Sequence, residues 1–485
     1  MTSPRQQKQL HIILNPASGR PGLSQTLFAS HLQPLLGPLQ ASGSWDVVRH
    51  ETKEEGDGVR VGGEVRAAIG AQKKVHAILL GGDGTTHEFL HGLILGNPDA
   101  DEAREDEESA SLDEVQLAIV PTGTANALYA GLYPPGSVPE EGKEGNDDEN
   151  VWRLRSARAL LAALLQDTAR QPKGEEKEEE ERRTLVPLTL TRTRTVRPAT
   201  TLHQEHLAHI ITSHALHAGI LRDSEALRAQ YPGIERFKMA AQMNAAIWAG
   251  GLVRLLPLSG ERAGVSVYDP AREAFVEPLR EGGGGEVRLE GPFLYLAALT
   301  TDRLEPHFVP APFSSTAALS QASSHPNPHP RPPAAIDVLA IRPLRSPAVS
   351  DALAQLAPAQ GDAGGEETSV WASERAAGVR AQFALGALTS ITAQMYDGGK
   401  HVALTYPVSA ATRAGAGAKV QEEALERAGR GEAVVEYYRA AGYVWEPAEG
   451  DAQAQLTCID GTVVRSIKTD VTVLHEWAGR VGVWR

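Results

Sequence analysis

Short apolar runs that end in polar, glycine-rich turns divide the first 135 residues into alternating elements. The runs predict strands at residues 10–14, 45–50, 77–80 and 115–120. Helical spacing predicts helices at 23–39 and 61–69, after Asp83 and after Asn126. Strands that alternate with helices are typical of a mostly parallel α/β sheet.

Beyond residue 136 the pattern changes to short β-like runs separated by turns and by charged or Gly/Pro/Ser-rich segments. These runs lie at 185–192, 209–216, 264–268, 293–298, 336–341, 434–444 and 457–464. One helical hairpin is expected within them, at 224–228 and 234–256. Flexible loops are expected at 314–333, 357–367 and 410–432. The second part of the chain is therefore expected to be mainly antiparallel β structure.

Three of the predicted strands end in loops rich in Gly, Ser, Thr and Asn. These loops are residues 15–20, 81–84 and 121–126. Ligands of open α/β sheets bind beyond the carboxyl ends of the strands, so three such loops predict a binding site at one sheet edge. Glycines allow close backbone approach, and a helix N-terminus offers N–H groups to an anion. The pattern favours a phosphate cradle.

Asp83 adds a carboxylate to this cradle. A negative charge opposes plain anion binding, but it suits a group that accepts a proton from an attacking hydroxyl or holds Mg²⁺ through water. The alternative is that Asp83 forms the turn or caps a helix. We expect phosphoryl transfer with Asp83 as the catalytic residue.

Composition and charge restrict the function classes further. The 485 residues are enough for two or three domains, and a net charge of −14 argues against a nucleic-acid partner. A single cysteine, Cys458, excludes a disulfide within the chain. The polar start and the lack of an 18-residue apolar run predict neither a signal peptide nor a membrane span. We expect a cytoplasmic protein that associates peripherally and transiently with membrane surfaces. The sequence does not determine its oligomeric state.

Four motifs in order resemble the diacylglycerol kinase catalytic-domain superfamily, in particular its sphingosine-kinase-like branch. They are Asn15-Pro16-Ala17-Ser18-Gly19, Gly81-Gly82-Asp83-Gly84-Thr85-Thr86-His87-Glu88, Pro121-Thr122-Gly123-Thr124-Ala125-Asn126, and the segment 217–225 followed by Arg228 and 235–237. Asp460-Gly461-Thr462 lies near the position of the family's terminal Asp-Gly-Glu. The resemblance is good over residues 10–133 and patchy beyond.

The resemblance implies an ATP- and Mg²⁺-dependent lipid kinase of two domains. Residues 1–135 would form a nucleotide-binding α/β domain like that of NAD kinases, and residues 136–485 a lipid-binding β-sandwich with long flexible insertions. Asp83 would be the catalytic acid/base residue. The residues expected to bind ATP are Asn15, Pro16, Thr52, Gly81, Gly82, Gly84, Thr85, Thr122, Gly123, Thr124, Asn126, Arg228, Arg236, Asp460 and Gly461. No metal ligand is assigned.

Two positions depart from the family pattern. Thr462 stands where the family has glutamate, and a threonine hydroxyl does not accept a proton at pH 7. Leu221 aligns with the aspartate that recognises the sphingoid amine, and Asp223 is the nearest carboxylate. We therefore take Asp223 as the candidate substrate-binding residue, although a helix N-terminus capped by Ser224 or Asp223 is the favoured explanation of this segment.

Structural explanations compete with function at the other positions. Asn15-Pro16 is an ordinary turn when taken alone, Thr122–Thr124 can cap the following helix while also binding phosphate, and the two arginines suit solvated helix ends. The spacing of Trp248, Leu252, Leu255 and Leu256 is helical and indicates core more than a lipid pocket. The histidines around residue 209 are too irregular in spacing to predict a metal site.

The expected function is transfer of the γ-phosphoryl group of ATP to the hydroxyl of a sphingoid base or a diacylglycerol-like lipid. Two alternatives stay open. One is an NAD kinase, which shares the Gly-Gly-Asp-Gly loop. The other is a non-catalytic nucleotide- or lipid-binding protein, an interpretation motivated by Thr462.

Overall fold

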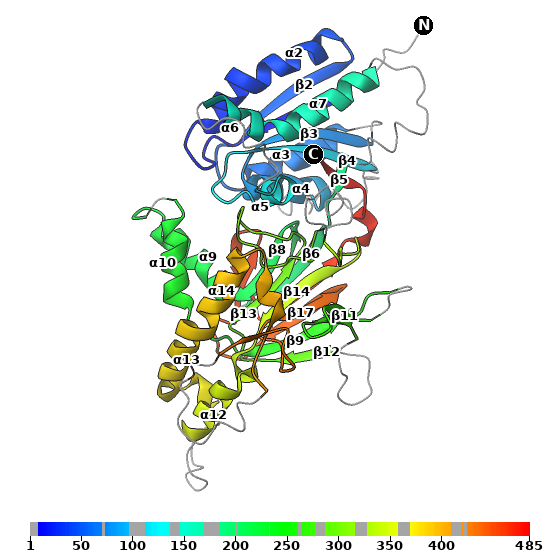
Figure 1. Cartoon of the computed structure of the whole chain (residues 1–485). Helices are drawn as coiled ribbons and strands as arrows, with labels where there is room; N and C mark the ends of the chain where they lie inside the picture. The colour runs from blue at the N-terminus through cyan, green and yellow to red at the C-terminus, as the bar shows by residue number, and fades with distance from the viewer. Residues whose placement is uncertain are drawn as a thin grey trace.

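The computed structural model describes residues 8–69, 73–96, 112–135, 146–168, 185–198, 202–231, 233–259, 264–277, 287–315, 327–356, 369–408, 420 and 424–485. Two units are stacked on one another (Figure 1). The upper unit is an α/β layer built mostly from the first part of the chain. The lower unit is built from antiparallel sheets with helices at one side.

The upper unit contains a six-stranded sheet in the order β2-β1-β3-β4-β22-β5. Its strands are Trp45–Glu51, Lys8–Leu14, Lys74–Gly81, Glu114–Pro121, Val481–Trp484 and Leu185–Pro187 in that order. All neighbouring pairs are parallel except β22 with β5. The prediction of a mostly parallel α/β sheet is confirmed.

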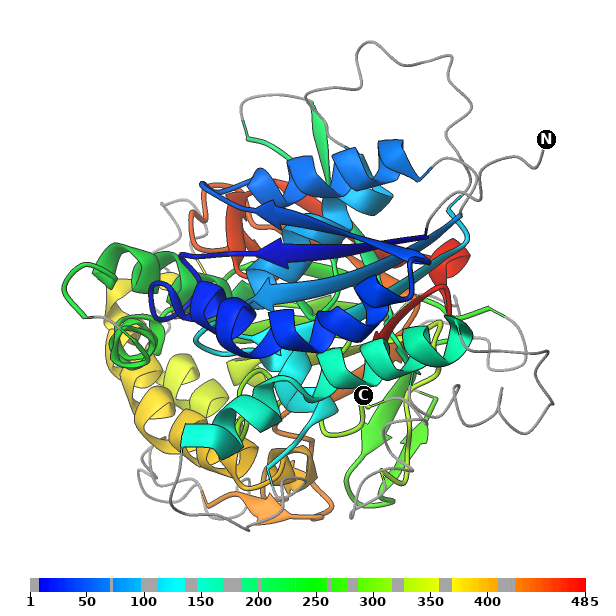
Figure 2. The ribbon, with the colours of Figure 1, turned by 90° about the horizontal axis from the view of Figure 1, so that it is seen from above.

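Helices cover both faces of this sheet because successive side chains of a strand point to opposite faces. One face carries α1 (Leu23–Leu27), η1 (Phe28–Leu32), α2 (Gln33–Ala41) and α7 (Arg155–Thr168), and the other carries α3 (Asp57–Ala68) and α4 (Asp83–Ile94) (Figure 2). Ile12 and Leu14 belong to the core under the first set of helices, and Ile13 belongs to the core under the second. Two further helices are α5 (Ala127–Leu132) and α6 (Asn146–Arg153).

Three segments that follow residue 135 join the upper unit. Helix α7 packs on β4 and β22, and strands β22 and β5 extend the sheet. Ser156 ties these parts together, because its hydroxyl donates to the Trp484 carbonyl at 2.6 Å and accepts the Ile119 N–H at 3.0 Å. The boundary at residue 135 stays a prediction, and the chain returns to the first sheet after that boundary.

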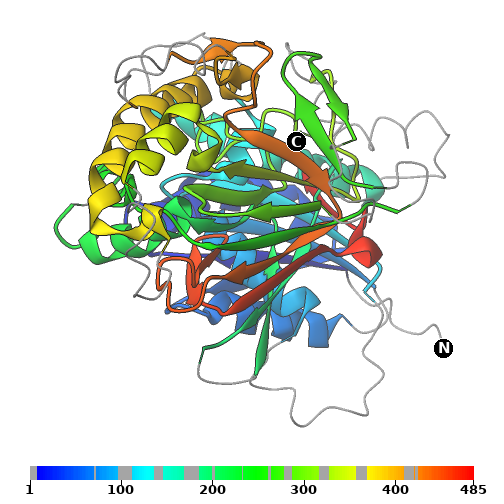
Figure 3. The same cartoon turned by 90° about the horizontal axis from the view of Figure 1, so that it is seen from below.

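The lower unit contains two antiparallel sheets that share one core. The larger has the order β11-β10-β17-β14-β13-β8-β19-β20 and the smaller β12-β9-β18-β21-β6-β7. Val253 and Trp445 of the smaller sheet belong to one buried cluster with Leu296 and Val338 of the larger. This arrangement confirms the predicted antiparallel sandwich (Figure 3).

The bounds of these strands complete the topology. The larger sheet consists, in sheet order, of Ala274–Val276, Ser266–Asp269, Glu436–Ala440, Ile336–Ile341, Tyr295–Leu299, Ile211–Ala215, Leu456–Ile459 and Thr462–Arg465. The smaller consists of Val287–Glu290, Gly251–Leu256, Gly442–Pro447, Lys468–Val473, Thr191–Val196 and His203–Ala208. A separate pair is β15 (Leu404–Thr405) with β16 (Glu426–Arg427).

The helices of the lower unit differ from the sequence prediction. The hairpin consists of α9 (Leu216–Leu227) and α10 (Glu235–Asn244), and the expected helix over 234–256 is wrong beyond Asn244, because Gly251–Leu256 is strand β9. Val253 and Leu255 are buried there while Leu252 and Leu256 are less so, the two-residue period of a strand between β12 and β18. A short apolar run does not distinguish the two structures by itself.

A helical layer beside the sandwich was not predicted. It contains α12 (Pro347–Leu356), α13 (Ala377–Phe383), η7 (Ala384–Leu388) and α14 (Thr389–Tyr396), seen along one side in Figure 3. Short 3-10 turns lie at Pro343–Arg345, Val370–Ala372, Glu374–Ala376, Lys400–Ala403 and His475–Trp477. Much of the loops expected at 314–333, 357–367 and 410–432 lies outside the described residues. Of the helices in the described ranges, none is long and apolar enough to cross a membrane.

Candidate active site

The polar loops predicted from the sequence meet at the carboxyl edge of the first sheet. Adjacent parallel strands β2, β1, β3 and β4 end there, followed by Thr52, Asn15, Gly82 and Thr122. Backbone hydrogen bonds join the loops to their neighbours: Asn15 N–H donates to the Leu80 carbonyl at 3.0 Å and Thr122 N–H to the Gly81 carbonyl at 3.0 Å. The sheet therefore brings these predicted site residues together.

Glycines allow these loops to touch. A Cβ atom on Gly123 would lie 2.7 Å from Cα of Gly82, and one on Gly19 would lie 1.9 Å from the Thr122 carbonyl oxygen. Gly81 is equally restricted, because a Cβ there would lie 2.5 Å from the Thr85 Cβ. No side chain larger than hydrogen fits at these contacts, so the loops form a closed backbone surface.

Several polar side chains of the loops serve the loops themselves. The Asn15 side-chain amide donates to the Thr85 hydroxyl at 2.9 Å, and the Asn126 side chain forms a closed pair of hydrogen bonds with Gly123 at 3.0 and 2.7 Å. Asn126 adopts φ 52°, a left-handed conformation that asparagine tolerates better than most residues. The Thr122 hydroxyl, in contrast, is buried and has no partner among the described residues.

The remaining predicted residues of the loops lie at their rim. Pro16 is partly buried beside Asn15, while Gly84 and Thr124 are exposed. Thr52 is buried, and its N–H donates to the Leu14 carbonyl at 2.9 Å. All of these positions belong to the same sheet edge, which agrees with the spatial grouping that the motifs imply.

Asp83 begins helix α4 but caps a different helix. Its two carboxylate oxygens accept the N–H groups of Ala127 at 2.7 Å and Leu128 at 3.1 Å, the first two residues of α5. The first N–H groups of a helix have no partner within it, so this carboxylate stabilises the start of α5. Burial raises the pKa of Asp83, although His209 and the two N–H bonds act in the opposite direction.

Asp460 lies in the β19–β20 hairpin turn and is buried against the upper unit. Asp460 and Gly461 have φ 46° and 101°, which fits the two-residue Asp-Gly turn typical of hairpins. The carboxylate accepts the backbone N–H groups of His209, Ile210 and Ile211 at 2.8 to 3.0 Å. Burial alone would raise the pKa of Asp460, but the charge and hydrogen bond of His209 outweigh it and hold the pKa well below the usual range.

Two histidines complete this cluster. His209 Nδ1 lies 2.6 Å from Oδ2 of Asp460, and His87 Nδ1, on helix α4, lies 3.3 Å from the same oxygen. The second contact joins the upper unit to the lower. Burial would lower the pKa of His209, but the charge and hydrogen bond of Asp460 together with the charge of Asp83 outweigh burial and raise it.

The donor atoms of His87, His209 and Asp460 lie within 4.8 Å of one another, close enough for a metal ion. The carboxylate, however, already accepts three backbone N–H bonds, and both imidazole nitrogens are directed at one of its oxygens. In this arrangement the two imidazoles are hydrogen-bond donors and the carboxylate oxygen is their common acceptor. We therefore assign hydrogen bonding, not metal binding, to this cluster.

The predicted residues of the α9–α10 hairpin are engaged with one another. Arg228 is 59% exposed and pairs with Glu225 at 2.6 Å. Arg236 is 8% exposed, lies over the Phe237 ring at 4.7 Å, and its Nε has no hydrogen-bond partner within the described part of the chain. Burial and the neighbouring Arg228 lower the pKa of Arg236. The contacts found for these two arginines within the described ranges do not include the glycine loops.

Asp223 is occupied by structural partners. Its carboxylate accepts Arg222 Nε at 2.6 Å and the Asn244 amide at 2.7 Å, so it fastens α9 to α10. The hydrogen bond from Arg222 lowers the pKa of Asp223. Leu221 packs with the buried Cys458 cluster, and Thr462 is exposed at the start of β20.

His87 and His209 were missed as functional candidates. His87 follows Asp83 by four residues, one helical turn, which places both on the same side of α4. His209 precedes a buried strand and carries no motif. Only the packing of the second unit brings it to Asp460, so no local pattern identifies it.

A family model matches the upper unit. Residues 9–148 match the model described as the diacylglycerol kinase catalytic domain. A comparison with curated protein sequences finds no significant match. The matched segment contains the three glycine-rich loops and Asp83, and it includes strands β1 to β4, which form the sheet edge described above.

Solved structures also resemble the chain. Two structures of a candidate diacylglycerol kinase from Bacillus anthracis str. Sterne are 11% and 12% identical, cover 97% of this chain and 95% and 96% of their own, and have TM-scores of 0.42. Yeast NADH kinase complexed with NADH is 8% identical, covers 99% of this chain and 84% of its own, and has a TM-score of 0.36. Because these values are low, the structures carry no argument, and the similarity to the diacylglycerol kinase catalytic domain rests on the family model that matches residues 9–148.

Proposed function

We propose that this protein is an ATP-dependent lipid kinase that phosphorylates a hydroxyl of a diacylglycerol-like lipid or a sphingoid base. The observation that carries the proposal is the convergence of four polar loops around Asp83 at one edge of a parallel sheet. The family of residues 9–148 supports the same activity.

The loops suit the phosphates of ATP. Gly82 and Gly123 leave a backbone surface that any Cβ would fill, and the Thr122 hydroxyl is buried without a partner in the described structure. Helix α4 starts at Asp83, and its first N–H groups favour an anion. ATP would be held by these groups together with Asn15, Pro16, Thr52, Gly81, Gly84, Thr85, Thr124 and Asn126.

Asp83 is the proposed catalytic residue of the upper unit. Its carboxylate lies at the cradle, and its charge interacts with His209 of the lower unit. The hydrogen bonds from α5 fix its orientation, which is the condition for acting on a bound hydroxyl. Most of the rate enhancement would come from positioning and from loop N–H groups facing the phosphates.

Mg²⁺ would neutralise the phosphates of ATP and polarise the transferred group. The two carboxylates of the first turns of α4, Asp83 and Glu88, are both bound to backbone N–H groups, Glu88 to Gly56 and Gly58 at 3.1 and 3.0 Å. These residues therefore do not offer a free ligand set. We assign no protein ligand to the metal and no step to it.

The lower unit would add charge and close the site. Arg236, with its buried unpartnered Nε in the described structure, and Arg228 would supply positive charge to the phosphates, and Asp460 with Gly461 would border the nucleotide. Asp223 is bound to Arg222 and Asn244, an arrangement that favours an uncharged lipid alcohol over a sphingoid amine. A lipid acceptor implies transient contact with a membrane surface by a cytoplasmic protein.

Two other functions compete with this proposal. An NAD kinase would use the same glycine loop, and a non-catalytic protein would bind the nucleotide without transfer. The match of residues 9–148 to a diacylglycerol kinase domain favours the lipid enzyme over NAD kinase. The fixed carboxylate of Asp83 favours an enzyme over a binding protein.

A radiolabelled-ATP transfer assay tests the proposal. The acceptor panel is sphinganine, sphingosine, phytosphingosine, diacylglycerol, ceramide, monoacylglycerol and NAD. We expect label on diacylglycerol or another lipid and none on NAD. Label on NAD alone would establish NAD kinase. ATP binding by calorimetry without label on any acceptor would establish the non-catalytic protein.

A further inference from the structure

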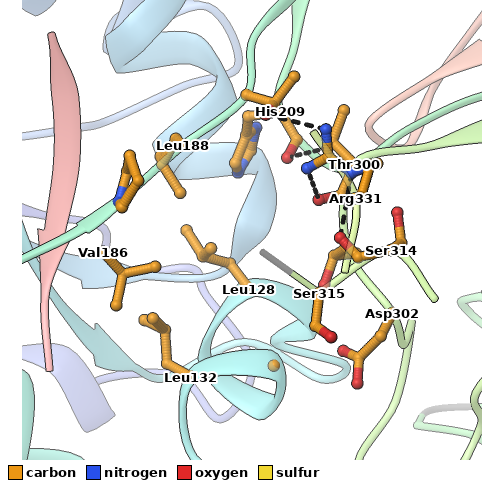
Figure 4. A pocket seen from close by; sticks show the side chains of 14 residues that line it. Leu128, Leu132, Val186, Leu188, His209, Thr300, Asp302, Ser314, Ser315 and Arg331 are labelled. Carbon is orange, nitrogen blue, oxygen red and sulfur yellow. Dashed lines mark hydrogen bonds between the residues drawn. The ribbon is translucent and has the colours of Figure 1, made fainter. Parts of the chain in front are cut away.

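A pocket lies beside Asp83, on the side of helix α5 (Figure 4). Its cavity volume is small, about 30 Å³, so it has room for the end of a molecule and not for a whole lipid. One wall is apolar and comes from Leu128, Leu132, Val186 and Leu188. The opposite wall is polar and includes Thr300, Ser314 and Ser315. A molecule with an apolar body and a hydroxylated end matches both walls.

His209 lies at one end of this pocket, and its orientation is fixed. Nδ1 is 2.6 Å from the Asp460 carboxylate, which has no proton to donate, so Nδ1 carries the proton. In the neutral imidazole, Nε2 then bears the lone pair. It is buried, and within the described structure it has no hydrogen-bond partner. A buried acceptor without a partner costs free energy unless a ligand satisfies it.

Leu128 links the pocket to Asp83. Leu128 lines the pocket with its side chain, and its N–H donates to Asp83 at 3.1 Å. Asp83 and His209 interact electrostatically, each shifting the pKa of the other. His209 therefore lies close enough to the carboxylate at the phosphate cradle to interact with it electrostatically.

Other proton acceptors of the cluster are occupied. Asp460 accepts three backbone N–H groups and two imidazoles, and both oxygens of Asp83 accept N–H bonds from α5. Thr462, at the position of the family's glutamate, is exposed and has no basic atom at pH 7. In the described part of this cluster, His209 Nε2 is the acceptor left open.

We propose that this pocket admits the hydroxyl end of an amphipathic alcohol and that His209 Nε2 accepts its proton during transfer. The inference rests on the proposed kinase function. The alcohol O–H bond breaks, its oxygen bonds to the γ-phosphorus, and the P–O bond to ADP breaks. The proton moves to Nε2, and the resulting imidazolium is paired with Asp460. His209 is then a catalytic residue, with Asp460 as its positioning residue.

The pH dependence follows from the groups that face His209. They are Asp460 from the β19–β20 turn and Asp83 and His87 from α4. Burial would lower the pKa of His209, but the charge and hydrogen bond of Asp460 together with the charge of Asp83 outweigh burial and raise it above its ordinary 6.5. The reaction needs the neutral imidazole as its base. This form is lost as pH falls through the raised pKa, so the decline in activity should begin at a pH above 6.5.

The first test is His209→Gln with His206→Gln as its matched control. Glutamine keeps an N–H donor for Asp460 but does not titrate. We expect kcat to fall roughly 100-fold with the KM for ATP unchanged, and the acidic limb of the pH profile to disappear. His206, on β7 beside His91, also has a buried Nε2 without a hydrogen-bond partner in the described structure, but it makes no contact with Asp460 there, and its variant should stay within about twofold. Wild-type kcat and an unchanged pH profile in His209→Gln would overturn the proposal.

A second test does not depend on turnover. A short-chain monoacylglycerol is titrated into ¹⁵N-histidine-labelled protein, and the His209 Nε2 resonance is followed by NMR. We expect a shift in the wild type and none in Gly131→Leu, because a Cβ at Gly131 already lies 3.0 Å from the Thr301 hydroxyl and a leucine would fill the pocket. Lipid phosphorylation without this shift would overturn the pocket and leave the kinase proposal intact. The shift without phosphorylation of any lipid would support the pocket and refute the kinase.

Discussion

Asp83 and Asp460 both lie beside the boundary of the two units, yet their environments move their pKa values in opposite directions. Asp83 accepts two N–H bonds from α5, and burial outweighs them, so its pKa is raised. Asp460 accepts three N–H bonds and faces two imidazoles, which together outweigh burial, so its pKa is lowered. The number of donors and the nearby cation decide the difference, not the residue type.

This difference assigns separate roles to the two aspartates. A carboxylate held firmly ionised by many donors binds a proton poorly, and it serves to orient its neighbours. A carboxylate at the phosphate cradle with fewer donors supplies charge to the reacting groups and to His209. We therefore expect substitution of Asp460 to affect stability first and substitution of Asp83 to affect turnover first.

Asp460→Asn should have the largest effect on stability. The amide would turn an NH₂ group toward N–H donors of residues 209–211, and the charge that holds His209 would be lost. Asparagine tolerates φ 46°, so the backbone is not the cause. We expect a loss of about 3 kcal/mol in urea unfolding.

The matched control for that variant is Asp451→Asn. Asp451 also caps backbone N–H groups, those of Gly250, Gln453 and Ala454, but no histidine hydrogen-bonds to it in the described structure. Its loss should cost about 1 kcal/mol. Equal losses in the two variants would show that capping alone, without the histidines, explains Asp460.

Asp83→Asn, in contrast to Asp460→Asn, should affect turnover more than stability. Turnover should fall by roughly 100-fold or more because the amide lacks the negative charge that stabilises the imidazolium formed on His209. Stability should fall by about 1 kcal/mol because the cap of α5 is weakened. Lipid phosphorylation and urea unfolding measure the two effects. A stability loss as large as that of Asp460→Asn would end the distinction between the aspartates.

Stability should depend on pH in two opposing ways. His214 and His401 are buried neutral, with pKa values lowered to about 3 by burial, so the unfolded state binds more protons below pH 6.5 and stability falls as pH falls. His209 has a raised pKa, so its contribution to the free energy of unfolding is full below pH 6.5 and is lost as pH rises through the raised pKa. Asp460 has a lowered pKa, so it stabilises the folded state above pH 3.8, and this stabilisation is lost as pH falls further.

The two aspartates are compared by repeating the unfolding at several pH values. The stability gap between wild type and Asp460→Asn should be widest between pH 3.8 and 6.5, where both Asp460 and His209 contribute. It should narrow at higher pH as His209 loses its proton. A gap that does not change across this range would contradict the pairing.

Thr462→Glu should have the smallest effect. The side chain is exposed at the start of β20, so stability should change by no more than about 0.5 kcal/mol. An added carboxylate there lies outside the buried cluster, and lipid phosphorylation should change less than about twofold. A large gain in kcat would show that the position still serves the reaction as it does in the family pattern.

Local patterns determined the upper unit. Apolar runs such as residues 77–80 have no stable place except a buried strand, and Gly82 and Gly123 indicate a close backbone approach. Asp83 and the polar loops were placed together because parallel strands end at one sheet edge. Strand β9 and helices α12–α14 were missed, because short apolar runs and amphipathic segments depend on what they pack against.

Only the tertiary structure decided what the charged and polar side chains do. The sequence marks Asp83 and Asp460 as separate motifs. In the folded protein, Asp83 accepts hydrogen bonds from the first N–H groups of α5, and Asp460 accepts one from the N–H of Ile211 at the start of β8. His209 has no motif, and its pairing with Asp460 spans 251 residues of sequence. Hydrophobic periodicity is a local property that the sequence determines by itself, whereas proton affinity depends on burial and partners that distant segments supply.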